Sequence, residues 1–242
     1  MDLNGKVAVV TGGSSGIGQA ISIALAKAGC QVIFTYNSSE TGAAKTLQTL
    51  GKNGAKFKLD LHRPDQIQAL FDFVSKQYGH LDILVNSAGI NRPRDLWSLD
   101  TWREVFEINL FALVHCTELA VKLMQGHGKI LNISSIYAEG KACWQGMPAY
   151  GASKAAVSNF TQVMAKNLGS GILVNAIAPG YVQTPLWQDT SEKQFVESGH
   201  EQLIDRMIQP DEIAHMAMAI LQNDAITGEI VVVDGGISLK TI

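Results

Sequence analysis

The feature that most constrains the fold is a regular alternation of short apolar runs with longer helical periods. Seven runs are short, rich in β-branched residues and mostly bounded by Gly, Asp or Asn, which is typical of buried strands. They span 6–10, 31–35, 56–60, 82–86, 129–134, 173–178 and 229–233. This alternation predicts an α/β chain, a doubly wound parallel sheet with helices on both faces.

Helical periods fill the intervals between these runs. They span 18–28, 41–50, 65–78, 101–124, 150–168 and 210–221, and Asp100 and Pro210 are suitable helix starts. At 242 residues without an evident linker, the chain fits one domain over 1–242. Ligands of such domains bind beyond the carboxyl ends of the strands, so those ends are where we look for chemistry.

Composition excludes several classes of function. The formal net charge is −3, which gives no basic footprint for nucleic acid. No apolar stretch is long enough to cross a membrane, and the first residues lack a signal-peptide core. The histidines and cysteines show no metal-ligand spacing, so we expect no metal site. Three scattered cysteines, Cys30, Cys116 and Cys143, predict reduced thiols and a cytoplasmic location.

The first run ends in a glycine-rich turn that precedes a helix. Its glycines differ in spacing from the common G-x-G-x-x-G fingerprint, but the same physics applies. Glycine lets the backbone turn tightly and approach a pyrophosphate, which the N–H groups of the helix start stabilise. We therefore predict cofactor contacts at Gly12, Ser14, Ser15, Gly16, Ile17 and Gly18.

The end of the second run bears on the choice between NAD and NADP. A carboxylate there would bind the ribose 2′-hydroxyl, whereas this chain has Asn37 and Ser38 and no acid before Glu40. These neutral groups tolerate a 2′-phosphate, although no Arg or Lys is near in the sequence. The pattern favours NADP over NAD.

The remaining strand ends supply further candidates. Asp60, followed by Leu61, is placed either to bind an adenine amino group or to cap its own strand, and both interpretations stay open. Small residues at Asn86, Ala88 and Gly89 would let the backbone lie against a ribose. A turn would bring backbone N–H groups and a hydroxyl toward a nicotinamide amide, through Pro179, Gly180, Val182 and Thr184.

Tyr150 and Lys154 stand four residues apart where an Ala-rich helix begins, so they share one helix face. An ammonium beside a phenol would lower its pKa and make Tyr150 a general acid/base. About 0.3 chance matches to this spacing are expected in the chain. A second match, Tyr137 and Lys141, lacks a supporting helix, and we discount it.

Asn109 lies within a largely apolar helical period. Such a residue is usually a hydrogen-bonded core amide, but here it could bind water near Lys154.

With these residues assembled, the chain resembles the short-chain dehydrogenase/reductase family over essentially its whole length. The matching elements occur in order: Thr11-Gly-x-x-x-Gly16-Ile-Gly18, Asp60, Asn86-x-Ala-Gly89, Asn109, Ser134-Ser135, Tyr150-x-x-x-Lys154, Pro179-Gly180 and Thr184. The resemblance implies a Rossmann-like, seven-stranded parallel sheet and commonly a homotetramer. It assigns proton transfer to Tyr150, carbonyl polarisation to Ser135, ribose binding and a lowered Tyr150 pKa to Lys154, and a relay water to Asn109.

Three positions depart from the family pattern. Ser87 replaces a second asparagine, which puts one internal hydrogen bond in doubt. Ser15 stands where NADP-preferring members often carry a basic residue. Ser135 and Tyr150 are fifteen positions apart rather than thirteen, so Ser134 is a possible substitute for Ser135.

The substrate is less constrained than the reaction. A lid over about 186–207, with Trp144, Tyr181 and Trp187, suggests an apolar pocket that would also include Ser135 and Tyr150. A contact between these aromatics and a neighbouring subunit is an equal alternative. Among family members, the chain is most similar to 3-oxoacyl-acyl-carrier-protein reductases.

An acidic carrier protein would need a basic docking surface, for which Lys129 and Lys141 are candidates. A polyol, sugar or general ketone dehydrogenase is equally compatible with the sequence. A non-catalytic dinucleotide sensor is a remote alternative, because the catalytic residues of the motif are present.

Overall fold

The computed structural model describes residues 1–92, 96–139, 146–187 and 190–240. A parallel sheet of seven strands has the order β3-β2-β1-β4-β5-β6-β7. Its strands are β1 (Val7–Thr11), β2 (Gln31–Tyr36), β3 (Gly54–Lys58), β4 (Ile83–Asn86), β5 (Gly128–Ile133), β6 (Ile172–Pro179) and β7 (Ile230–Val233). The predicted doubly wound, Rossmann-like fold is confirmed.

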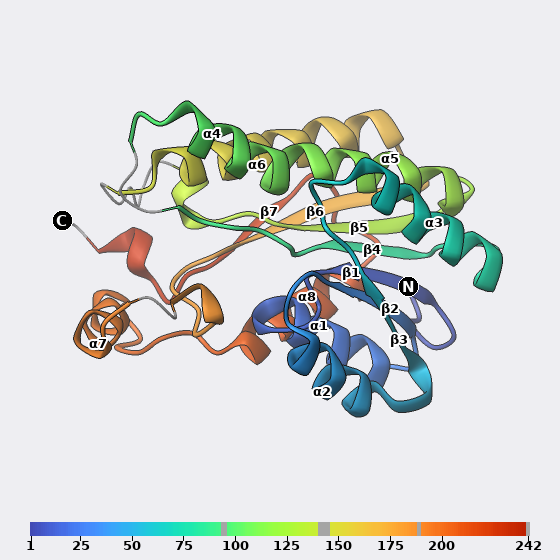
Figure 1. The fold of residues 1–242 in the computed structure, drawn as a ribbon, viewed down its shortest axis with the longest axis horizontal. Coiled ribbons are helices and arrows are strands. Elements are labelled where there is room, and N and C mark those ends of the chain that lie inside the picture. The colour runs from blue at the N-terminus through green and yellow to red at the C-terminus, as the bar shows by residue number, and fades with distance from the viewer. Residues whose placement is uncertain (93–95, 140–145, 188–189, 241–242) are drawn as a thin grey trace.

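Two layers of helices cover the sheet (Figure 1). One layer contains α1 (Gly16–Lys27), α2 (Glu40–Leu50) and α8 (Pro210–Gln222). The other contains α3 (Pro64–Tyr78), α4 (Leu99–Phe106), α5 (Ala112–Met124) and α6 (Pro148–Leu168). A further helix, α7 (Glu192–Glu201), lies apart from both layers.

The alternation of side chains along the central strand explains why its sequence is continuously apolar. Ala8 and Val10 of β1 belong to the core beneath α1 and α8, whereas Val7 and Val9 belong to the core beneath α3 and α5. All four are buried. A strand covered on both faces has no side for polar residues, so its chemistry is confined to its end.

The strand order reverses beside β1, which pairs with β2 on one side and β4 on the other. The crossovers on the two sides of this point lead to opposite helical layers, which leaves a crevice beyond the carboxyl ends of β1 and β4. The glycine-rich turn follows β1 directly, so this topology places it at the crevice.

Two predicted elements differ from the observed ones. The helical period at 101–124 is interrupted by a π-helical segment, Glu107–Phe111, between α4 and α5. Strand β3 lies two residues before its predicted position, so Asp60 follows the strand instead of ending it. Pro210 does begin α8. No helix in the described parts of the chain is long and apolar enough to span a membrane.

Candidate active site

Glycines in the turn after β1 are required by close backbone contacts. A Cβ on Gly12 would lie 2.9 Å from Ala88 Cα, and the φ of Gly12 is +69°. A Cβ on Gly18 would lie 2.4 Å from the Gly12 carbonyl oxygen. The turn therefore packs against both the segment after β4 and the first turn of α1, as a backbone cradle requires.

The ends of β1 and β4 are held together by a hydroxyl. Thr11 Oγ1 accepts hydrogen bonds from the backbone N–H groups of Ser87 and Ala88, both at 3.1 Å. Asn86 donates to Asn132 Oδ1 at 2.9 Å and to Thr117 Oγ1 at 3.3 Å. Its own Oδ1 is buried and has no hydrogen-bond partner among the described residues.

The start of α1 suits an anionic group. Ser15 is its N-cap, and the first turn contains no acidic residue. Ser14 is buried and Ile17 packs against the core. A Cβ on Gly16 would lie 3.1 Å from Thr184 Cγ2, so the loop after β6 closes over the helix start. Backbone N–H groups, a positive helix end and flanking hydroxyls fit a dinucleotide pyrophosphate.

At the end of β2 the structure supplies basic groups that the local sequence lacks. Asn37 and Ser38 are exposed, and the parallel register sets Lys58 of β3 beside Tyr36. Glu40 forms an ion pair with Lys56, which lowers the pKa of the Glu40 carboxyl. The carboxylate is thereby neutralised, and the exposed Lys58 adds a positive charge at this rim.

Asp60 acts as a cap of the turn after β3. Its Oδ1 accepts from the His62 backbone N–H and contacts His62 Nδ1, both at 3.0 Å. The backbone hydrogen bond from His62 lowers the pKa of Asp60. Its Oδ2 accepts no hydrogen bond from the described residues, and Leu61 follows half-buried. The cap is therefore present, and an adenine contact through Oδ2 stays a prediction.

Helix α6 presents Tyr150 and Lys154 on one face at the carboxyl end of β5. Pro148 begins the helix, which sets its start two residues before the tyrosine. Lys154 Nζ donates to the carbonyl oxygen of Ile133 at 2.7 Å and lies 5.7 Å from the centroid of the Tyr150 ring. The two side chains thus lie close together, as their spacing predicts.

The prediction that Lys154 lowers the Tyr150 pKa is wrong for this structure. Burial raises the pKa of the Tyr150 phenol, and a hydrogen bond with Ser135 only partly opposes this effect. Burial also lowers the pKa of Lys154 to about 8. Desolvation penalises the charged form of both groups, so Tyr150 is a neutral phenol at physiological pH.

The two adjacent serines have different partners. Ser134 Oγ donates to the Lys154 carbonyl oxygen at 3.1 Å and lies 2.7 Å from Ser158 Oγ, so it joins β5 to α6. Ser135 Oγ instead accepts from the Tyr137 backbone N–H at 3.3 Å and lies beside the Tyr150 hydroxyl, where it partly opposes the rise in the Tyr150 pKa. The geometry therefore pairs Ser135, rather than Ser134, with the phenol.

Asn109 lies in the π-helical segment, almost fully buried. Its amide exchanges hydrogen bonds with the backbone of Ile90 (2.8 and 2.9 Å) and donates to Ser153 Oγ at 3.0 Å. A Cβ on Gly89 would lie 3.3 Å from Asn109 Oδ1 and 3.5 Å from Lys154 Nζ. Asn109 therefore fixes the segment after β4 beside the lysine.

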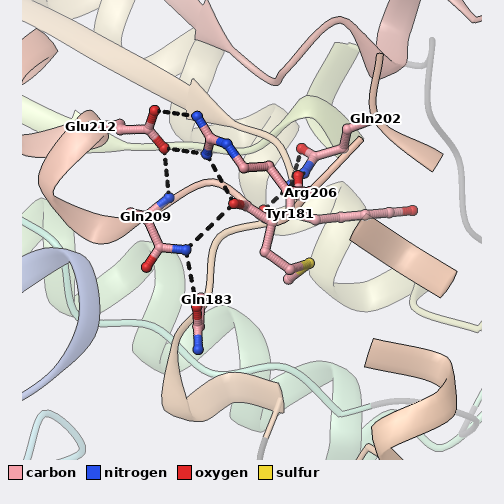
Figure 2. Close-up of polar contacts among 7 residues, drawn as sticks. Tyr181, Gln183, Gln202, Arg206, Gln209 and Glu212 are labelled. Carbon is pink, nitrogen blue, oxygen red and sulfur yellow. Dashed lines mark hydrogen bonds and ion pairs between the residues drawn. The ribbon is translucent and has the colours of Figure 1, made fainter. Parts of the chain in front are cut away.

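A polar network fixes the loop after β6 (Figure 2). Gln202, about 1% exposed, accepts from the Tyr181 N–H at 3.1 Å and donates to the Tyr181 carbonyl at 3.3 Å. Arg206 donates twice to Glu212 at 2.8 Å, and Gln209 Nε2 donates to Gln183 Oε1 at 2.9 Å. Sequence analysis did not identify this network, because its members are dispersed from 181 to 212.

The same loop carries the predicted cofactor contacts. Pro179 ends β6, and a Cβ on Gly180 would lie 2.7 Å from Asp234 Cα. Val182 is buried and bridges to Ile208. These contacts leave little freedom for the loop, so the half-buried Thr184 is held at the crevice.

A cavity of about 400 Å³ lies between this loop and α7. Tyr137, Tyr181 and Trp187 form its aromatic side, and ring contacts link them to one another and to Tyr150. The rest of the lining is polar: Ser191, Lys193, Gln194, Glu197, Ser198 and Glu201. The lining of this cavity is therefore mixed: Tyr181 and Trp187 lie where the apolar pocket was expected, and α7 adds polar side chains.

The remaining residues that the sequence analysis considered near the site have different outcomes. Trp144 and Lys141 lie outside the described residues. Lys129 lies buried at the opposite end of β5, where Nζ contacts Asp224 at 2.7 Å and the Asn223 carbonyl at 2.6 Å. It is unable to form a docking surface at the site mouth, so that prediction is wrong. Tyr137, which we discounted, lies against Tyr150; its own sequence context contains no signal for this contact.

Comparisons with known proteins agree with this fold. A family model described as enoyl-(acyl carrier protein) reductase matches residues 12–238. A 3-oxoacyl-(acyl-carrier-protein) reductase of Vibrio cholerae is 36% identical, with 98% of each chain covered. A cis-4-hydroxycyclohexanecarboxylate dehydrogenase of Sinomonas cyclohexanicum is 38% identical, with 96% of each covered.

Solved structures give the same result. An aldohexose dehydrogenase of Thermoplasma acidophilum has a TM-score of 0.88 and 31% identity, covering 99% of this chain and 96% of its own. A blue fluorescent protein from a metagenomic library, in complex with NADPH, has a TM-score of 0.90 and 34% identity, covering 98% and 99%. The chain belongs to the short-chain dehydrogenase/reductase family. It is an oxidoreductase of the kind that acts on carbonyl and alcohol groups.

Proposed function

We propose that Tyr150 exchanges a proton with the substrate oxygen during hydride transfer between NADP(H) and a carbonyl/secondary-alcohol pair. The observation that carries this proposal is the grouping of three side chains at the end of β5, where Ser135 acts on the Tyr150 phenol and Lys154 Nζ lies 5.7 Å from the Tyr150 ring centroid. A nicotinamide cofactor supplies or accepts the hydride when bound. Ser135 donates a hydrogen bond to the carbonyl oxygen, where negative charge grows.

Burial makes Tyr150 a proton donor for reduction, since the neutral phenol persists at physiological pH. Lys154, with its pKa lowered to about 8, is still mostly protonated at neutral pH and binds the nicotinamide ribose. Asn109 anchors a water beside Lys154 for proton replacement. The side chains of Asn109 and Lys154 both lie close to Gly89, and this proximity supports the role.

The cofactor is NADP(H) rather than NAD(H) in this proposal. Neutral Asn37 and Ser38, a neutralised Glu40 and the additional charge of Lys58 support 2′-phosphate binding. The NADPH complex of a structural neighbour is consistent with it. Asp60 and Leu61 would hold the adenine, and Val182 and Thr184 the nicotinamide amide.

Two substrate classes have support. The 3-oxoacyl thioester reductases among the relatives favour an acyl thioester. A polyol or sugar substrate is favoured by the polar lining of the cavity, and relatives include a glucose 1-dehydrogenase of Bacillus subtilis. In both cases the segment 186–207 acts as the lid, with Tyr181 and Trp187 touching the substrate.

The assembly and location follow the family expectation. We propose a homotetramer in the cytoplasm. Exposed apolar side chains on α5 and α6, Val114 and Val163, and Phe111 beside α5 support an interface between copies. The buried free thiols of Cys30 and Cys116 suit a reducing compartment.

A substrate panel tests the proposal. NADPH and NADH are supplied in parallel with simple ketones, a 3-oxoacyl thioester and sugars, and oxidation is followed at the nicotinamide absorbance. Turnover with at least one carbonyl, and a lower KM for NADPH than for NADH, is expected. Tight cofactor binding without hydride transfer to any carbonyl would instead indicate a dinucleotide sensor.

A further inference from the structure

A second tyrosine borders the place where a substrate carbonyl would meet Tyr150. Tyr137 lies in the short helix Ile136–Glu139, and its backbone N–H donates to Ser135 Oγ at 3.3 Å. Its ring meets the Tyr150 ring edge-on, with centroids 6.1 Å apart. A substrate oxygen held by Ser135 and Tyr150 therefore places its neighbouring carbon atoms beside Tyr137.

The hydroxyl groups near this point form a directed chain. Tyr137 donates to the Tyr181 oxygen at 3.2 Å, and burial, together with the nearby Glu201 carboxylate, raises the pKa of the Tyr181 phenol. A carboxylate only accepts, so this neighbour favours a Tyr181 proton turned toward Glu201. The Tyr137 proton is committed to Tyr181. Among the described residues no group donates to the Tyr137 oxygen, which leaves it as an acceptor at the cavity wall.

The charge behind this acceptor is negative. Glu201 and Glu197 line the cavity, and Lys193, the one cation among the described lining residues, lies 3.7 Å from Glu197. A substrate carboxylate or phosphate would meet an acceptor oxygen backed by this charge, which is unfavourable in a partly dry site. A substrate hydroxyl would donate to the same oxygen at no such cost.

The position of the acceptor is set before any ligand arrives. Gln202 holds both backbone groups of Tyr181 and directly follows Glu201 in the chain (Figure 2). Burial raises the pKa of Tyr137, so it stays a neutral phenol over the working pH range. A fixed acceptor discriminates more sharply than a mobile one, because little ordering is needed on binding.

We infer that Tyr137 is a specificity-determining residue, accepting a hydrogen bond from a second hydroxyl on a small neutral substrate close to the reacting carbon. This inference rests on the proposed hydride transfer. The substrate class is therefore hydroxyketones and their vicinal diols, rather than acyl thioesters or keto acids. The second hydroxyl keeps its proton and its oxidation state; only the carbonyl carbon gains hydride and the carbonyl oxygen gains a proton.

The test compares four probes with NADPH: 1-hydroxy-2-butanone, 2-pentanone, 2-oxobutanoate and the neutral N-acetylcysteamine thioester of 3-oxobutanoate. The first two have the same number of non-hydrogen atoms, and only the first carries a hydroxyl group beside the carbonyl. In the wild type, kcat/KM for the hydroxyketone should exceed that for 2-pentanone on the order of tenfold. Tyr137→Phe should reduce that ratio to about one. Tyr78→Phe, distant on α3, is the matched control and should keep the ratio.

A second variant keeps the test decisive if Tyr137→Phe does not fold. Glu201→Gln removes the negative charge and should raise kcat/KM for 2-oxobutanoate relative to the hydroxyketone by about threefold or more. A wild-type preference for 2-pentanone, the keto acid or the thioester over the hydroxyketone would overturn the inference while leaving hydride transfer intact. Absence of turnover with all four probes would overturn both proposals.

Discussion

At the residue scale, Ser134 and Ser135 carry neighbouring hydroxyls with different partners. Ser134 is hydrogen-bonded to the Lys154 carbonyl and to Ser158, whereas Ser135 lies beside the Tyr150 hydroxyl and acts on its pKa. Removing the Ser135 hydroxyl should lower kcat on the order of a hundredfold, because one donor to the developing oxyanion is lost. Ser134→Ala should instead lower the unfolding free energy by about 1–3 kcal/mol, since buried partners lose a hydrogen bond.

Steady-state kinetics and thermal denaturation of the two alanine variants separate these roles. The assignment fails if Ser134→Ala is the variant that loses turnover while Ser135→Ala keeps it.

Lys154 gives a prediction about pH. Its pKa is lowered to about 8, so the ammonium is present below that pH and is lost above it. The Tyr150 pKa is raised, so the phenol does not titrate in this range. The rate of ketone reduction should therefore be nearly flat from pH 6 to 7 and fall above about pH 8.

Lys154→Arg keeps its charge to much higher pH. A kcat–pH profile of this variant should have a lower rate but no decline near pH 8. The same decline in both proteins would assign it to another group.

Sequence analysis located Tyr150, Lys154 and Ser135 because helical spacing and strand ends are local properties. It predicted the wrong direction for the Tyr150 pKa, because burial depends on the whole fold and no local pattern records it. Tyr137 was discounted for the same reason: its approach to Tyr150 depends on the turn after β5, not on a helix of its own.

At the element scale, the pairing of β2 with β3 determines the charge beside the proposed 2′-phosphate site. Lys58 is 22 positions from Tyr36 but directly opposite it in the sheet. Lys58→Gln should raise KM for NADPH by on the order of fivefold and leave KM for NADH nearly unchanged, since an exposed charge contributes modestly. Lys52→Gln, in the turn before β3, is the control. Equal effects on both cofactors would contradict the role.

The loop network of Figure 2 gives a second prediction at this scale. Glu212 accepts from Arg206 and from the Gln209 N–H, and its pKa is lowered to about 2. A carboxyl with a lowered pKa stabilises the fold above its unfolded value, near 4.5, and this contribution is lost as pH falls toward 2. Glu212→Gln should lower Tm at pH 7 by about 2 °C, since the pair is partly exposed.

Thermal denaturation from pH 7 to pH 2.5 checks this result. The Tm difference should shrink across the range, and Glu118→Gln, which removes an exposed helical pair on α5, should change Tm by less. A difference that is constant with pH would show that Glu212 acts through something other than its charge.

The boundaries of elements show where local patterns end. Six helical periods and seven strands follow from apolar spacing, yet the π-helical segment at Glu107–Phe111 does not, because Asn109 is turned inward by bonds to Ile90 and Ser153. Helix α7 is polar and short, so the apolar pattern did not predict it as a helix; the sequence analysis placed these residues only within a lid segment.

At the scale of the whole molecule, the strand order brings residues from six separate segments to one crevice. The turn after β1, the segment after β4, the end of β5, the start of α6 and the loop after β6 converge there, with α7 closing the far side of the cavity. The parallel crossovers make this convergence predictable from the alternation of elements. The polarity of the cavity was not predictable from the sequence, because it depends on which face of α7 turns inward.

The central claim is that the Tyr150 hydroxyl delivers the proton that accompanies hydride transfer. Its most direct test is a single turnover of NADPH oxidation with a ketone at pH 7, compared between the wild type and Tyr150→Phe, with cofactor affinity measured separately. We expect a rate at least about a hundredfold lower in the variant, with nearly unchanged NADPH affinity. A variant that oxidises NADPH at the wild-type rate would contradict the account.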